Sequence, residues 1–191
     1  MSSTDPKPLA AIGFLTVVRY EQHGFLGGYL VLNTSGRPLE FHCTAPVKPN
    51  RAQEILYGPT LEPYLYGEQI GQALIAKSQL LPLAICTDLA AVLSVREFVA
   101  PPVALVVASA ETNTEPPSAP IAAVHHRFDA GHAAVRPMFQ LGANRLAVAA
   151  THADDQARVA EALRPVAEHF DLSEPFERIR GAIDEAQRSS R

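Results

Sequence analysis

The residues best suited to covalent chemistry are a neighbouring histidine and cysteine, His42 and Cys43, in the segment RPLEFHCTAPV (37–47). A thiolate beside an imidazole is the arrangement of a cysteine nucleophile and its base. The same segment predicts a β-strand, in which alternate side chains face opposite sides. Cys43 would then share a buried apolar face with Leu39 and Phe41, while His42 points the other way. We therefore expect no catalytic residue here and keep His42 and Cys43 as candidates for an alternative function.

The residues after this strand are better suited to binding. Asn50 is expected to cap a short helix over residues 51–58, ended by Gly58. The free N–H groups of a helix start attract anions, and Lys48 and Arg51 lie beside it in the sequence. Tyrosines, which join an apolar ring to a polar tip, follow in the next helix. The predicted ligand- or partner-binding residues are Lys48, Asn50, Arg51, Tyr57, Tyr64 and Tyr66. The alternative is a strand-to-helix connection with solvated cations.

A second group of polar residues lies in the segment HHRFDAGH (125–132). Imidazoles and a carboxylate can ligate a metal ion, so His125, His126, Asp129 and His132 are candidate ligands. On a strand, however, the two adjacent histidines would face opposite ways. The spacing matches no familiar metal signature, HExxH included. We expect a polar strand end and an exposed loop, and no bound metal.

Strands and turns dominate the first part of the chain. Residues 10–20, 25–33 and 37–47 are rich in β-branched and aromatic side chains and are separated by short turns, which predicts an antiparallel three-stranded meander. Gly27 and Gly28 in the second strand are interpreted as a β-bulge.

Helical and buried-strand patterns alternate after the meander. Helices are predicted over residues 51–58, 61–79 and 89–100, the last capped by Asp88. Continuous apolar runs at 81–88 and 103–110 predict strands buried on both faces. Further strands are expected at 121–128 and 145–152, and a pair of helices at 154–170 and 174–188.

This order of elements predicts one α/β (α+β) domain spanning residues 1–191. The expected fold is a mixed sheet that begins with the antiparallel meander, with helices packed on it and a C-terminal helical pair. Residues 1–9 form a polar leader. Residues 111–120, ETNTEPPSAP, form a proline-rich loop that is the best candidate for an internal boundary.

Composition narrows the function classes. The chain has 191 residues, 47% of them hydrophobic, which is typical of a globular protein. The net charge of −4 argues against general binding to nucleic acids or anionic membranes. The N-terminal apolar run is too short for a membrane span and lacks the basic start of a signal peptide, so we expect a cytoplasmic protein. Its two cysteines are then expected to be free, buried thiols.

The missing motifs favour binding over catalysis. The sequence contains no GxSxG, Walker A or GxGxxG motif. We predict a non-catalytic binding or accessory module without a cofactor, whose partner is a protein, a second copy of the chain or a small anionic ligand. The alternative is a small hydrolase or transferase that uses His42 and Cys43 or the 125–132 cluster.

Overall fold

The computed structural model describes residues 10–21, 23–107 and 138–189. They form an α+β fold around a seven-stranded mixed sheet, in the order β3-β2-β1-β4-β5-β7-β6. The strands are β1 (Ala11–Tyr20), β2 (Gly24–Asn33), β3 (Pro38–Cys43), β4 (Ala84–Thr87), β5 (Val103–Val107), β6 (Phe139–Leu141) and β7 (Asn144–Ala147). The predicted N-terminal meander is confirmed, because β1, β2 and β3 pair antiparallel in chain order.

The centre of the sheet is parallel. β4 pairs with β1 on one side and with β5 on the other, both in parallel register. Such strands need cover on both faces, which explains the unbroken apolar runs that encode β4 and β5. β7 and β6 then close this end of the sheet antiparallel.

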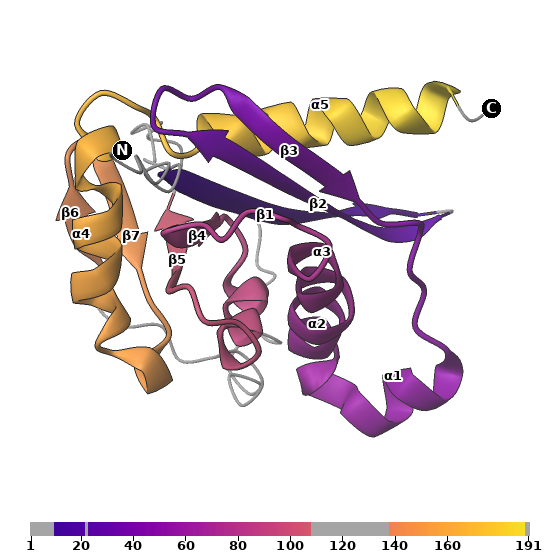
Figure 1. The fold of residues 1–191 in the computed structure, drawn as a ribbon. Helices are drawn as coiled ribbons and strands as arrows, with labels where there is room; N and C mark the ends of the chain where they lie inside the picture. The colour runs from indigo at the N-terminus through magenta and orange to yellow at the C-terminus, as the bar shows by residue number, and fades with distance from the viewer. Residues whose placement is uncertain (1–9, 22, 108–137, 190–191) are drawn as a thin grey trace, which may run out of the picture.

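Helices cover both faces of the sheet. The helical elements are α1 (Arg51–Tyr57), η1 (Gly58–Thr60), α2 (Leu61–Pro63), η2 (Tyr64–Gln72), α3 (Ala73–Ile75), η3 (Ala90–Glu97), η4 (Ala150–His152), α4 (Asp155–Ala167) and α5 (Glu174–Ser189). α2, the π-helical η2 and α3 follow one another without a break over residues 61–75, so the helix predicted over 61–79 ends four residues early. In Figure 1, α5 lies along one face of the meander and α2 and α3 lie on the other.

Each face has its own apolar core. On one side, α4 and α5 pack on the sheet, and Phe14 of β1 meets Phe176 of α5 edge to face with ring centroids 5.8 Å apart. On the other side, η2, α3 and η3 pack on the same strands, with Ile70, Leu74 and Val92 fully buried. The C-terminal helical pair is thereby confirmed as part of the core.

The paired glycines of β2 serve this close packing. The predicted bulge at Gly27 and Gly28 is wrong, because both residues pair with β1 in unbroken register. A Cβ on Gly27 would collide with Ile70, and one on Gly28 would collide with Ile179 of α5. The glycines let a helix approach each face of the strand.

The segment after β4 also differs from the prediction. Residues 90–97 form a 3₁₀ helix, η3, preceded by Leu89 without a side-chain cap. Asp88, the predicted cap, instead accepts a hydrogen bond from Arg180 of α5. The predicted strand at 121–128 and the proline-rich loop at 111–120 lie outside the described residues, as does the polar leader 1–9.

Candidate functional site

His42 and Cys43 do not form a nucleophile and base. Their side chains leave β3 on opposite faces, as expected from alternation. The expected burial of Cys43 is wrong, because its side chain is exposed and both cysteines are free. The reason is local, because the β2–β3 register shifts between Val31 and Leu32. Leu39 therefore packs on the core beside η2, α3 and η3, while Phe41 is exposed. Cys86, in contrast, is buried, and burial raises its thiol pKa to about 12.

The His42 side chain belongs to a small polar network that joins β3 to the end of α3. Glu40 Oε2 accepts hydrogen bonds from His42 Nε2 at 3.1 Å and from Ser78 Oγ at 2.7 Å. The backbone N–H of Gln79 also donates to the carboxylate, at 3.2 Å. The Ser78 bond and these other donors lower the pKa of Glu40. Because both side-chain donors contact Glu40, the network holds β3 against the segment that follows α3.

The hydrogen-bonding groups at the start of α1 find partners within the helix itself. Asn50 caps the helix as predicted: its side chain accepts from the Gln53 N–H at 2.9 Å, and the Gln53 side chain accepts from the Asn50 N–H at 2.9 Å. Arg51, which is largely exposed, pairs with Glu54 at 3.0 Å. The helix has only seven residues, and its capping box engages the N–H groups of Asn50 and Gln53. These contacts do not favour the small anionic ligand that the sequence suggested.

Lys48 lies beside a cleft of about 410 Å³ between the β1–β2 turn and the α1–α2 segment. The cleft carries cationic groups from Arg19 and Lys48 and carboxylates from Glu21, Glu54 and Glu62. Because the two signs are mixed, this cleft has no net preference for an anion.

Two of the three predicted tyrosines, Tyr57 and Tyr64, join α1 to the body of the protein. Tyr57, at the end of α1, stacks on Tyr64 with ring centroids 3.9 Å apart and planes inclined at 17°. The Tyr64 hydroxyl accepts a hydrogen bond from Gln69 Nε2 at 2.8 Å. Tyr66 is half-buried against Phe25, with ring centroids 5.5 Å apart, and burial raises its pKa. Tyr57 and Tyr64 therefore position α1, whereas Tyr66 packs against β2.

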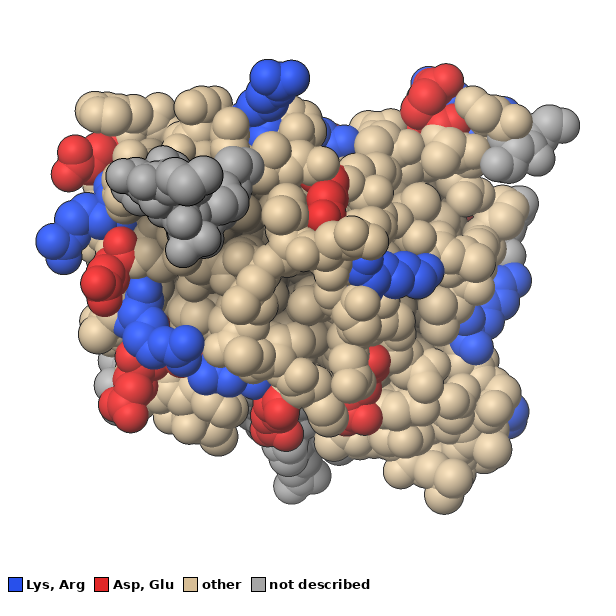
Figure 2. Space-filling model, viewed as in Figure 1, with Lys and Arg blue, Asp and Glu red and all other residues tan. Residues whose placement is uncertain are grey.

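The apolar surface of α1 itself faces outward. Every residue of α1 is exposed or only half-buried; Ile55 is 66% exposed and Leu56 is 82% exposed. Figure 1 shows α1 projecting at one end of the molecule, and in Figure 2 the surface at the lower right, where it lies, is largely uncharged. Sequence reasoning assigned no role to Ile55 and Leu56. The signal was an apolar pair in a short capped helix, but sequence alone does not show which side of such a helix is covered.

The exposed apolar residues of α1 form one stripe. Ala52, Ile55 and Leu56 occupy positions i, i+3 and i+4, which lie on the same face of a helix, and all three are exposed. Gln53 and Tyr57, at i and i+4 on another face, are half-buried against the body. We call residues 50–57 the arm; its outward face is apolar and its inward face is polar and aromatic.

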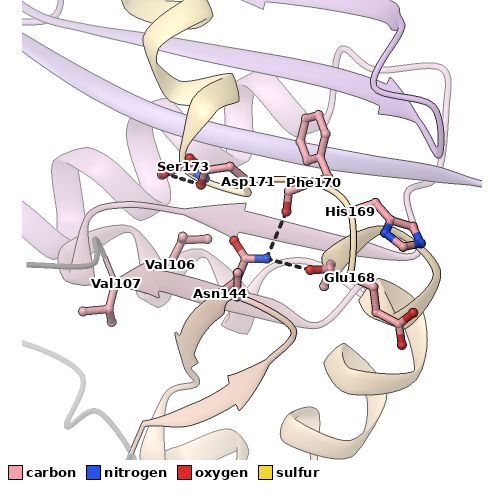
Figure 3. Close-up of a pocket in the computed structure, with 10 residues that line it drawn as sticks. Val106, Val107, Asn144, Glu168, His169, Phe170, Asp171 and Ser173 are labelled. Atoms are coloured by element: carbon pink, nitrogen blue, oxygen red, sulfur yellow. Dashed lines mark hydrogen bonds between the residues drawn. The ribbon is translucent and has the colours of Figure 1, made fainter. Parts of the chain in front are cut away.

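A larger hollow, of about 580 Å³, lies between β7 and the turn from α4 to α5 (Figure 3). The most buried polar side chain there is Asn144, and its hydrogen bonds are used within the protein. Its Nδ2 donates to the backbone carbonyls of Ala167 at 3.1 Å and Phe170 at 3.0 Å, and its Oδ1 accepts from the Leu172 N–H at 2.9 Å. Asn144 therefore orders the turn between α4 and α5.

The described residues contain neither a metal-binding cluster nor a membrane-spanning helix. The candidate ligands His125, His126, Asp129 and His132 lie outside the described residues. Among residues 10–21, 23–107 and 138–189, no group of three potential ligands could hold a metal ion. Within the same ranges, no helix combines the length and apolarity that spanning a membrane requires.

Comparison with known proteins identifies no relative from which a function could be inferred. No protein-family model matches the chain, and a search of curated proteins finds no match either.

Proposed function

We propose that the protein is a non-catalytic protein-binding module and that the arm is its docking element. The observation that carries the proposal is the outward apolar face of α1, with Ile55 and Leu56 both mostly in contact with solvent. Exposed apolar side chains are common singly, but a projecting helix with an apolar stripe is the geometry of helix-in-groove recognition.

The energetics support such a role. Burying an isoleucine or leucine side chain against a partner stabilises a complex by about 1.5–3 kcal/mol for each residue. The capping box and the Tyr57–Tyr64 stack hold α1 in helical form before binding. Less conformational entropy is then lost on association, so more of the apolar contribution remains as affinity.

The roles of the predicted residues follow from this arrangement. Asn50 and Tyr57 order the arm, and Tyr64 anchors it. Lys48 and Arg51, together with Glu54, which was not among the predicted residues, supply charged groups at the rim of the apolar stripe. A polar rim around an apolar centre is the usual composition of a protein interface.

The test is affinity capture from a lysate of the source organism with tagged protein as bait. Wild type is compared with Leu56→Asp and with Leu81→Asp, because Leu81 is a leucine of similar exposure, 77%, outside the arm. We expect at least one protein to be retained by wild type and by Leu81→Asp, and lost at least tenfold from Leu56→Asp. A set of captured proteins that does not change with Leu56→Asp would contradict the proposal, provided that the variant keeps the wild-type circular dichroism spectrum.

A further inference from the structure

The surface around α4 contains an apolar hollow of about 390 Å³. It lies where α4 meets the segments that lead into β4 and β5. Its apolar lining comes from Leu83, Pro102, Ala162 and Pro165, and its rim carries Arg158 and Glu161 of α4. Leu83 is 48% exposed, so the hollow presents apolar side chains to solvent.

This hollow and the arm lie at opposite ends of the molecule. Figure 1 shows α4 at the left and α1 at the lower right, with the sheet between them. A chain therefore cannot fill its own hollow with its own arm, whereas the arm of another chain can reach it.

The occupant we propose for the hollow is the apolar stripe of the arm, Ile55 and Leu56, from a second copy of this chain. This inference rests on the proposed function and names its partner. The chemistry of the two surfaces matches: α1 presents two aliphatic side chains that are largely exposed, and the hollow is lined by aliphatic and proline side chains and is of a size to receive them.

The charged groups beside the two surfaces are complementary as well. Arg51 and Glu54 stand three residues apart on α1, and Arg158 and Glu161 stand three residues apart on α4. With the two helices antiparallel, Glu54 faces Arg158 and Arg51 faces Glu161. Arg158 already lies 3.0 Å from Asp155 and donates to the Ala100 carbonyl at 3.3 Å, which orients its guanidinium at the rim. Opposite charges around an apolar centre select the partner and its orientation.

An arm-to-hollow contact joins two different surfaces, so it is heterologous. Such a contact closes into a ring when the rotation between copies permits, and otherwise extends into an open chain. Because only a short helix is buried, we expect association that depends on protein concentration rather than a permanent oligomer.

Sedimentation velocity over a hundredfold range of concentration tests the association. We expect the weight-average sedimentation coefficient of wild type to rise with concentration, and that of Leu56→Asp and of Leu83→Asp to stay at the monomer value. Leu81→Asp, two residues from Leu83 but outside the lining of the hollow, should associate like wild type. A charge-reversed pair, Arg158→Glu with Glu54→Arg, should regain at least half of the association that either single change loses.

Cysteine cross-linking tests which surfaces meet. In a Cys43→Ser background, one preparation carries Leu56→Cys and a second, of different size through a tag, carries Leu83→Cys. We expect a disulfide-linked heterodimer on mixing under mild oxidation, and much less product from either preparation alone. A product from the Leu56→Cys preparation alone would show that two arms meet each other, which overturns the inference.

The failure of this inference is distinct from failure of the proposed function. If wild type remains monomeric throughout the concentration range and no heterodimer forms, the second copy is excluded as the partner. If a different protein is then captured through Leu56, the self-association is overturned but the arm remains the docking element.

Discussion

Tyr57 stacks face to face on Tyr64, with ring centroids 3.9 Å apart, and this pair connects the exposed helix α1 to the buried helical segment behind it. Tyr57 closes α1, and Tyr64 opens η2, whose Leu65 and Ile70 are fully buried. None of the seven residues of α1 is buried, so the stack is what holds α1 against the core formed by η2, α3 and η3.

Replacing Tyr64 with alanine should release the arm with little change in the rest of the fold. A stacked aromatic pair contributes about 0.5–1.5 kcal/mol beyond its buried area. We expect trypsin to cleave the native variant faster after Arg51, with a fall in melting temperature of only a few degrees. Tyr66→Ala is the control, because Tyr66 packs on Phe25: it should lower global stability more. Equal protection of Arg51 in wild type and Tyr64→Ala would show that the stack does not hold the arm.

The two thiols should differ sharply in reactivity. Cys43 is exposed, whereas Cys86 is buried with its pKa raised to about 12. At pH 8, native protein should therefore react with one equivalent of a thiol reagent rapidly, and with a second only after denaturation. Cys43→Ser should remove the fast phase. Fast reaction of that variant would show that Cys86 is reached in the native state.

The Glu40 network should make stability depend on acid pH. Hydrogen bonds, first that of Ser78, lower the Glu40 pKa below its ordinary value of 4.5 in the folded state. The folded protein then binds fewer protons than the unfolded chain, so this contribution is present above pH 4.5 and is lost as the pH falls through the folded pKa.

Urea unfolding at several pH values measures this contribution. We expect Glu40→Gln to be less stable than wild type at pH 7, and the difference to shrink steadily below pH 4.5. A difference that stays constant down to pH 3 would show that Glu40 acts through packing and not through its charge.

Alanine substitutions of Gly181, within α5, and of Gly28, on the strand that α5 packs against, should have opposite effects on stability. A Cβ at Gly28 would collide with Ile179, so Gly28→Ala should lower the free energy of unfolding by about 1–3 kcal/mol. At Gly181, within α5, a Cβ meets nothing within 4 Å. Gly181→Ala should therefore raise stability by about 0.5–1 kcal/mol. Chemical denaturation of both variants provides the test; a neutral Gly28→Ala would show that α5 packs less closely on β2.

The order of elements was largely predictable because it depends on local patterns. The meander, the buried central strands and the C-terminal helical pair follow from alternation, continuous apolar runs and helical periodicity. The Asn50 cap was also predictable, since Asn50 and Gln53 interact within one turn. β6 was missed, because three residues carry too little pattern.

The candidate site was less predictable because exposure is a tertiary property. One register shift next to Leu39 exposes Phe41 and Cys43, although strict alternation places all three on one buried face. In the same way, the sequence does not predict whether Ile55 and Leu56 are buried or exposed, because this depends on where α1 lies in the fold. The polar residues near the arm were found from the sequence, but its apolar face was not.

Site-specific photocrosslinking tests the central claim, that α1 is the docking element, most directly. A photoreactive amino acid is placed at position 56 and, as a control, at the exposed position 185 of α5, and cells of the source organism that express each variant are irradiated. The account predicts a discrete protein adduct from position 56, either with a second copy or with another protein, and none from position 185. Position 56 yielding no adduct, or the same adducts as position 185, would contradict it.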